Sequence, residues 1–135
     1  MQGNRAIDIL IADDDAEDLE LIEEAILSFE PNAQLHMVND GKAAVDYLAT
    51  LQDHNLPALI ILDYNMPQLK GSEVLLHLGT QSRYNAVPKV ILSTSNTEIY
   101  IDECKRQGAA GYFVKPNTQR ELDLMAEEML ALVTG

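Results

Sequence analysis

Residues 60–67 have the sequence IILDYNMP, in which an apolar run ends in an aspartate and a proline follows shortly afterwards. A short apolar run bounded by turn residues is typical of a strand that is buried on both faces. Such a strand would carry Asp63 at its carboxyl end. Ligands of open parallel sheets bind just outside this edge. The stretch therefore predicts a parallel sheet with a functional carboxylate at its edge.

The combination of an apolar strand and an amphipathic helix repeats along the whole chain. Apolar residues at helical spacing follow each expected strand, and these strands cover residues 6–12, 34–38, 57–62, 88–92 and 110–114. The connections have the short lengths usual for α/β units. We therefore expect an α/β fold, a doubly wound parallel sheet with helices on both faces.

Local patterns predict where several helices begin. Asp15 and Asp40 each precede an apolar helical pattern, and we expect each to cap its helix. Thr118 and Glu121 form the pattern of a capping box. Another helix is expected to begin at residues 96–97, and the last helix to continue to the C-terminus.

The composition restricts the class of protein. The 135 residues include 22 Asp and Glu against 9 Lys and Arg, which gives a net charge of −13 and argues against nucleic-acid binding. No apolar run approaches membrane-spanning length, and the N-terminus is unlike a signal peptide. Cys104 is the only cysteine, which fits a reducing cytoplasm. We expect one cytoplasmic domain over residues 1–135, with no output domain and no nucleic-acid or membrane partner.

Chemically active side chains follow four of the expected strands. The first strand is followed by Asp13 and Asp14, the third by Asp63, the fourth by Ser93 and the fifth by Lys115. Because the carboxyl ends of parallel strands share one edge, these side chains are expected to converge. Three carboxylates in one pocket would repel one another, and Mg²⁺ would relieve that repulsion.

The same five side chains suggest a type of chemistry. A carboxylate beside a divalent cation can attack phosphorus and form an acyl phosphate. Lys115 can then supply positive charge to the phosphoryl oxygens, and the Ser93 hydroxyl can donate a hydrogen bond to them. Each residue also has a structural alternative. The first acidic residues can cap a helix, Asp63 can start a turn, Ser93 can belong to a helix cap, and Lys115 can be a surface lysine.

Four motifs give the chain a specific resemblance. They are ILIADDD at residues 9–15, LDYNMP at 62–67, LSTS at 92–95 and GYFVKP at 111–116. In this order and spacing they resemble the receiver domain of two-component response regulators, over essentially the full chain. The resemblance implies a flavodoxin-like (βα)5 fold with strand order 2-1-3-4-5.

The resemblance also implies roles for the residues at the strand ends. Asp63 matches the phosphoacceptor, and Lys115 matches the lysine that accompanies it. Asp13 and Asp14 match the acidic pair that holds Mg²⁺. Asn65 matches the position whose backbone carbonyl completes the metal shell.

Three further positions match elements of the family's switch. Ser93 matches the switch hydroxyl, and Tyr112 matches the aromatic residue that moves between outward and inward rotamers. Pro116 matches a proline that usually follows a cis peptide bond. Asn117 departs from the apolar residue that often comes next, and Tyr64 is interpreted as a residue that shapes the rim of the pocket.

The implied partners are proteins. A histidine kinase or a histidine phosphotransfer protein would donate the phosphoryl group. The activated chain would contact an output protein, or a second copy of itself, through residues 96–107, 110–114 and 118–133, where Ile99 and Tyr100 are candidate contact residues. We expect no enzymatic activity beyond slow self-dephosphorylation.

Two alternatives remain open at this point. Hydrolases of the haloacid-dehalogenase kind also use a strand-end aspartate and Mg²⁺, but they usually carry a second aspartate two residues later, where this chain has Asn65. A degenerate receiver would bind partners without being phosphorylated. The complete set of acidic residues, serine and lysine argues against that alternative.

Overall fold

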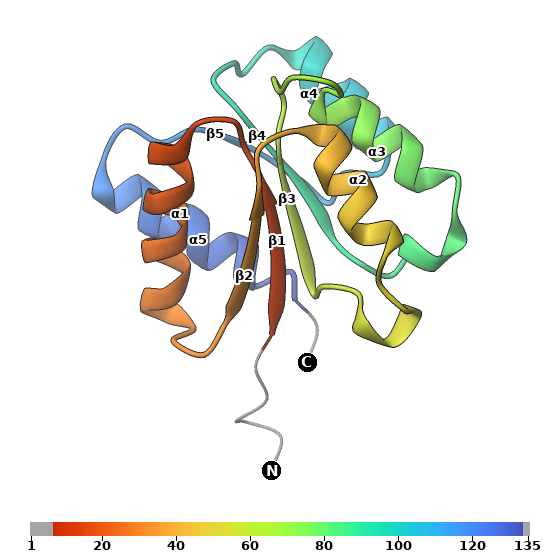
Figure 1. The fold of residues 1–135 in the computed structure, drawn as a ribbon. Coiled ribbons are helices and arrows are strands. Elements are labelled where there is room, and N and C mark those ends of the chain that lie inside the picture. Colours follow the sequence, from red (N-terminus) through yellow and green to blue (C-terminus); the bar gives the residue numbers. More distant parts are fainter. Residues whose placement is uncertain (1–6, 134–135) are drawn as a thin grey trace.

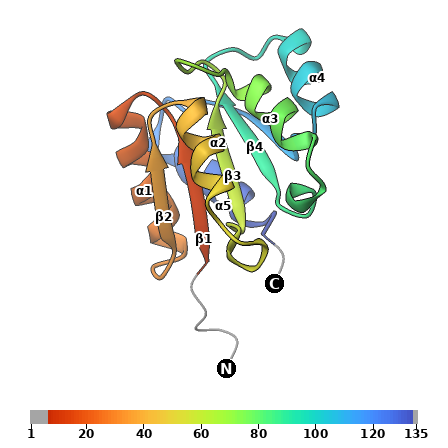
Figure 2. The same ribbon diagram turned by 45° about the vertical axis from the view of Figure 1, so that its right-hand side comes forward.

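The computed structural model describes residues 7–133, which form a parallel five-stranded sheet with helices on both faces (Figure 1). The strands are β1 (Asp8–Ala12), β2 (Gln34–Val38), β3 (Leu59–Asp63), β4 (Lys89–Ser93) and β5 (Gly111–Val114). Their order in the sheet is β2-β1-β3-β4-β5, and Figure 2 shows the first four of these strands side by side. The predicted fold class and strand order are confirmed.

Between residues 7 and 133 the chain also forms five α-helices and two short 3-10 helices. The α-helices are α1 (Ala16–Phe29), α2 (Gly41–Ala49), α3 (Gly71–Gly79), α4 (Glu98–Arg106) and α5 (Gln119–Leu130). The 3-10 helices are η2 (Asp53–Asn55) and η3 (Ser82–Tyr84), and η3 lies in the connection between α3 and β4. The last α-helix ends at Leu130, so it is slightly shorter than expected.

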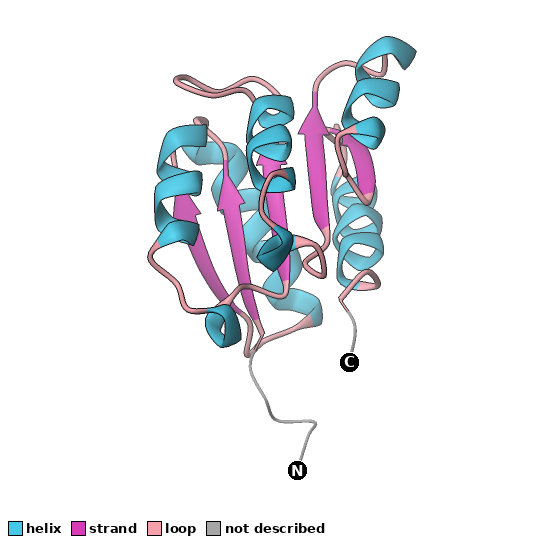
Figure 3. Ribbon diagram, turned by 90° about the vertical axis from the view of Figure 1, so that its right-hand side faces the viewer, coloured by secondary structure: helices cyan, strands magenta, loops and turns pink. Residues whose placement is uncertain are grey.

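The two faces of the sheet are covered by different helices. Helices α1 and α5 pack on one face, and α2, α3 and α4 pack on the other, so helices lie in front of and behind the sheet in Figure 3. Successive residues of the central strands alternate between the two cores: Ile9 and Ile11 join one, and Leu10 and Ala12 join the other. All residues of β3 and β4 are buried, as expected for strands that are covered on both faces.

The predicted helix caps are largely confirmed. The Asp15 carboxylate accepts hydrogen bonds from backbone N–H groups at the start of α1, and Asp40 does the same for α2. The Thr118 hydroxyl accepts from the Glu121 N–H, but the Glu121 carboxylate accepts from Asn117 and does not close a capping box. Helix α4 has Thr97 as its N-cap residue, with no side-chain cap bond.

The predicted strand that begins at Pro57 starts two residues later, because proline has no N–H to donate to a neighbouring strand. The Ala58 N–H makes the first bond to β1, at the Asp8 carbonyl. Between residues 7 and 133, no helix combines the length and hydropathy that crossing a membrane requires.

Candidate functional site

Three carboxylates meet at the carboxyl edge of the sheet. Asp13 follows β1 and Asp63 ends β3, and these strands are adjacent, with Ala12 opposite Leu62. Each of Asp13, Asp14 and Asp63 offers a carboxylate oxygen, and the three oxygens lie within 4.8 Å of one another. The predicted convergence of the acidic residues is therefore present in the structure.

Burial makes these carboxylates unusual. Asp13 is fully buried and Asp63 is 5% exposed, whereas Asp14 is exposed to solvent. Burial, followed by the charge of Asp13, raises the pKa of Asp63 to about 7. Burial also raises the pKa of Asp13. Two neighbouring buried carboxylates therefore disfavour one another's charge.

The donor set fits a divalent cation that prefers oxygen ligands. One oxygen of Asp13, Oδ1, accepts a hydrogen bond from the Asp15 N–H at 2.9 Å. The other, Oδ2, is buried and forms no hydrogen bond of good geometry, although the Lys115 ammonium faces it at 3.2 Å. A buried carboxylate oxygen that lacks a hydrogen bond, beside two further carboxylates, is the type of environment in which Mg²⁺ or Mn²⁺ binds.

Lys115 brings positive charge to this cluster from the strand on the other side of β4. Its backbone N–H donates to the Ser93 carbonyl at 2.8 Å, and this bond extends the pairing of β4 and β5 by one residue. Its Nζ lies 3.2 Å from Asp13 Oδ2 and 3.4 Å from Asp63 Oδ2. Lys115 therefore faces the acidic residues, as the sequence predicted.

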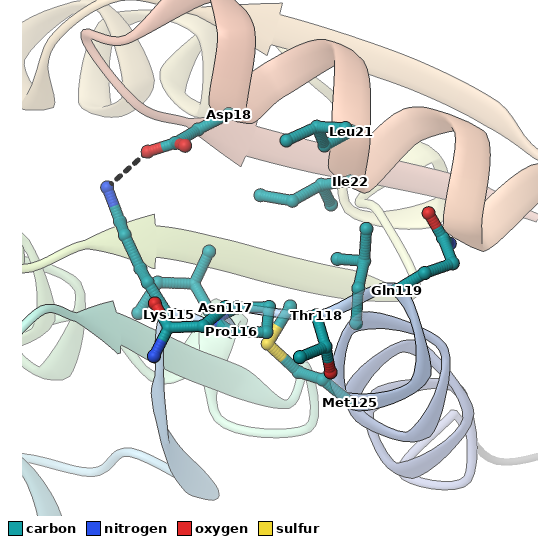
Figure 4. Close-up of a pocket in the computed structure, with 11 residues that line it drawn as sticks. Asp18, Leu21, Ile22, Lys115, Pro116, Asn117, Thr118, Gln119 and Met125 are labelled. Carbon is teal, nitrogen blue, oxygen red and sulfur yellow. Dashed lines mark hydrogen bonds and ion pairs between the residues drawn. The ribbon is translucent and has the colours of Figure 1, made fainter.

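Asp18, in the first turn of α1, is part of this site, although sequence reasoning did not identify it. Lys115 Nζ donates to Asp18 Oδ2 at 2.7 Å, and this is the shortest of its three ion pairs (Figure 4). Burial alone would lower the pKa of Lys115, but the hydrogen bond to Asp18 and the charges of Asp63 and Asp13 raise it. The available signal was an acidic residue in the first turn of α1, which begins at the same edge of the sheet.

A cavity of about 230 Å³ lies beside this ion pair, between α1 and the start of α5. Asp18 and Lys115 form one end of it, and the labelled Leu21, Ile22 and Met125 line its apolar part (Figure 4). The cavity was not foreseen from the sequence, because its walls come from segments far apart along the chain.

Ser93 and Tyr112 are connected through one loop residue. Ser93 ends β4 and is nearly fully buried, and its Oγ accepts a hydrogen bond from the Ser95 N–H at 3.0 Å. The Tyr112 hydroxyl on β5 donates to the Ser95 carbonyl at 2.7 Å. Both predicted switch residues therefore contact the same short loop after β4.

The loop after β3 curls back over the strand end. The Asn65 N–H donates to Asp63 Oδ1 at 3.4 Å, so Asn65 lies next to the carboxylate. The Gly71 N–H donates to the Tyr64 carbonyl at 2.9 Å. A Cβ at Gly71 would come within 2.6 Å of the Asp63 carbonyl oxygen, so this close approach requires glycine.

Tyr64 differs from its interpretation as a residue of the pocket rim. It is buried, its hydroxyl donates to Glu103 Oε1 at 3.0 Å, and its ring stacks on Tyr100 with centroids 5.0 Å apart. Burial and then the Glu103 hydrogen bond raise the pKa of Tyr64 to about 12. The residue after Asp63 thus contacts α4 directly.

The prediction of a cis peptide bond before Pro116 is wrong for this structure. No cis peptide bond occurs among the described residues, so the Lys115–Pro116 bond is trans. The trans form of such a bond is favoured by about 0.5–1 kcal/mol when nothing in the surroundings selects the cis form.

Comparisons with known proteins agree with this architecture. The family model described as "Response regulator receiver domain" matches residues 9–127. The chain is 29% identical over 123 residues to the "Probable methanogenesis regulatory protein FilR2" of Methanothrix harundinacea (strain 6Ac), covering 90% of this chain and 79% of that protein. It is 26% identical over 145 residues to "Two-component response regulator ARR8" of Arabidopsis thaliana, covering 96% of this chain and 64% of that protein.

Solved structures give the same result. The phosphorylated cyanobacterial phytochrome response regulator RcpA has a TM-score of 0.85 and 26% identity, with 96% of this chain and 94% of that chain covered. The Mn²⁺-bound form of response regulator Rcp1 has a TM-score of 0.81 and 26% identity, with 93% and 92% covered. The resemblance seen in the four sequence motifs is confirmed, and the chain belongs to the response regulator receiver domain family of two-component signalling.

Proposed function

We propose that this chain accepts a phosphoryl group on Asp63 from a histidine kinase or a histidine phosphotransfer protein. The observation that carries the proposal is the position of Asp63, a strand-end carboxylate that is 5% exposed and has the Lys115 ammonium 3.4 Å away. The P–N bond of the donor's phosphohistidine breaks, and a P–O bond to an Asp63 oxygen forms. The imidazole nitrogen keeps the electron pair of the broken bond.

The proposed cation site consists of Asp13, Asp14, Asp63 and the backbone carbonyl of Asn65. It is supported by the clustered oxygens of the three aspartates and by the buried Oδ2 of Asp13, which forms no hydrogen bond of good geometry. Mg²⁺ bound there would compensate negative charge on the carboxylates and on the phosphoryl oxygens. Lys115 contributes its own positive charge from the end of β5. The Ser93 hydroxyl is the proposed hydrogen-bond donor to the modified Asp63.

We infer that phosphorylation is read out through Ser93, Ser95 and Tyr112. Because Ser93 and Tyr112 both bond to Ser95, a movement of the Ser93 hydroxyl toward the phosphoryl group would shift the loop that holds the Tyr112 ring. The proposed test of this link is Ser93→Ala, which should still take up phosphate but no longer change the NMR signals of the Tyr112 ring. A normal Tyr112 response in that variant would contradict the link.

The proposed output surface consists of α4, β5 and α5. Exposed apolar side chains on it support contact with a protein, since Ile99 is 73% exposed, Val114 is 46% exposed and Leu124 is 49% exposed. The partner is an output protein or a second copy of the chain. We place this exchange in the cytoplasm and expect no catalysis beyond slow self-dephosphorylation.

Labelling by a small acyl-phosphate donor tests the central proposal. Wild-type protein with Mg²⁺ and acetyl phosphate should gain an acid-stable, base-labile phosphoryl group, and Asp63→Asn should gain none. The matched control is Asp46→Asn, which removes an exposed carboxylate whose ion pair is with Lys42 on α2. Undiminished labelling of Asp63→Asn would reject the phosphoacceptor assignment.

A further inference from the structure

Asp18 is the preferred partner of the Lys115 ammonium. The Nζ–Oδ2 distance is 2.7 Å for Asp18, against 3.2 Å for Asp13 and 3.4 Å for Asp63. The two residues are 97 positions apart, so the contact depends on the packing of α1 beside the end of β5. Of the three carboxylates, that of Asp18 therefore lies nearest to the ammonium in the unphosphorylated chain.

Asp18 does not belong to the group of carboxylates that can share a cation. That group contains Asp13, Asp14 and Asp63. Among the described residues, the only ion pair of Asp18 is with Lys115. A cation bound by the other three carboxylates would reduce their attraction for the ammonium and leave the contact with Asp18 in place.

A lysine side chain can exchange partners of this kind. Its ammonium is a compact charge with three donors on a flexible stem, so it can move between acceptors that surround it. We propose that Asp18 is a positioning residue that holds Lys115 while Asp63 is unmodified and competes with the phosphoryl group for its ammonium. This inference rests on the function proposed above, since it concerns the same aspartate and lysine.

Removal of the Asp18 charge should therefore help phosphorylation. Lys115 would be released toward Asp63, and the incoming phosphoryl anion would meet one negative charge fewer; both effects act in the same direction. The Asp18 side chain is 29% exposed and that of Lys115 is 18% exposed, so solvent screens part of the interaction. We expect a change of roughly two- to fivefold in rate, the range that partly exposed ion pairs produce.

The experiment compares three variants with the wild type. Asp18→Asn removes the charge and keeps the size, Asp18→Glu keeps the charge, and Glu20→Gln removes an exposed charge from the same helix. Glu20 makes no ion pair within residues 7–133. The initial rate of phosphoryl uptake from acetyl phosphate at saturating Mg²⁺ should rise in Asp18→Asn only. Loss of the label should be slower in that variant.

A second measurement is made without phosphate. The NMR signals of the Lys115 Cε methylene should shift in Asp18→Asn and stay near their wild-type positions in Asp18→Glu and Glu20→Gln. Equal uptake rates in Asp18→Asn and Glu20→Gln, in a wild type that labels normally, would overturn this inference alone. A wild type that is not labelled at all would overturn the proposed function, and this inference with it.

Discussion

Two lysines occupy opposite edges of the sheet and have opposite surroundings. Lys115 follows β5 at the carboxyl edge, with three carboxylates within 3.4 Å of its Nζ. Lys89 begins β4 at the other edge, where its Nζ donates to the carbonyls of Tyr84 at 2.7 Å and Val87 at 3.0 Å. Lys89 has no carboxylate partner among the described residues.

The two environments shift the pKa values of the two lysines in opposite directions. Burial lowers the pKa of Lys89, because carbonyl dipoles compensate its charge only in part. The acidic neighbours of Lys115 outweigh its burial and raise its pKa. The two carbonyls that accept from the Lys89 ammonium lie at the end of η3 and in the connection from η3 to β4, so these contacts hold that loop in place. The excess of negative charge around Lys115 is typical of functional sites.

The largest expected difference between the two lysines is in phosphoryl uptake. Lys115→Met should slow labelling by acetyl phosphate about 100-fold, the loss seen when one donor to a developing anion is removed. Lys89→Met should label at the wild-type rate, because its ammonium lies at the other edge of the sheet. Initial rates at saturating Mg²⁺ measure both. If both variants lost labelling rate to a similar extent, the different surroundings of the two lysines would not reflect different roles in phosphoryl uptake.

The second expected effect concerns stability at the carboxyl edge. Asp63 has a pKa of about 7 in the folded chain against 3.8 as an ordinary value, so the folded state holds a proton that the unfolded state releases. Without Mg²⁺, the free energy of unfolding should therefore fall as the pH rises from about 4 to about 7, by roughly 1–3 kcal/mol. Urea unfolding at pH 5 and pH 8 measures the larger part of this fall.

Asp63→Asn should show a flatter pH dependence, and Asp46→Asn should follow the wild type. Addition of Mg²⁺ at pH 8 should stabilise the wild type more than Asp63→Asn, because the cation compensates the carboxylate charges. A wild type whose stability rises between pH 5 and pH 8 in the absence of Mg²⁺ would contradict the repulsion inferred for this cluster.

The sequence was sufficient to predict the fold and the strand-end part of the site. Periodicity and turn residues are local, and they located all five strands and the caps at Asp15 and Asp40. The positions of Asp13, Asp63 and Lys115 followed from one rule about the carboxyl edge of parallel sheets. These inferences needed no knowledge of how the helices pack.

What the sequence could not predict depends on contacts between distant segments. The ion pair of Asp18 and Lys115 requires α1 to pack beside the end of β5. The sequence near Asp18 shows only an acidic residue in the first turn of a helix, which does not identify Lys115 as its partner. The contact of Tyr64 with Glu103 likewise depends on where α4 lies. The carbonyl partners of Lys89 come from the turn that precedes it, and a lysine at the start of a strand would ordinarily be assigned to the surface.

The smallest expected effect is on the stability conferred by Lys89. Lys89→Met keeps the apolar stem and loses the ammonium, so the Val87 carbonyl loses its hydrogen bond while the cost of burying the charge disappears. The free energy of unfolding should fall by about 1 kcal/mol.

The control is Lys105→Met on the exposed surface of α4, which should change stability less. Urea unfolding with Mg²⁺ present isolates this effect from the carboxylates. If Lys89→Met stabilised the protein, the two carbonyls would be holding the ammonium at a net cost, and Lys89 would not secure the loop.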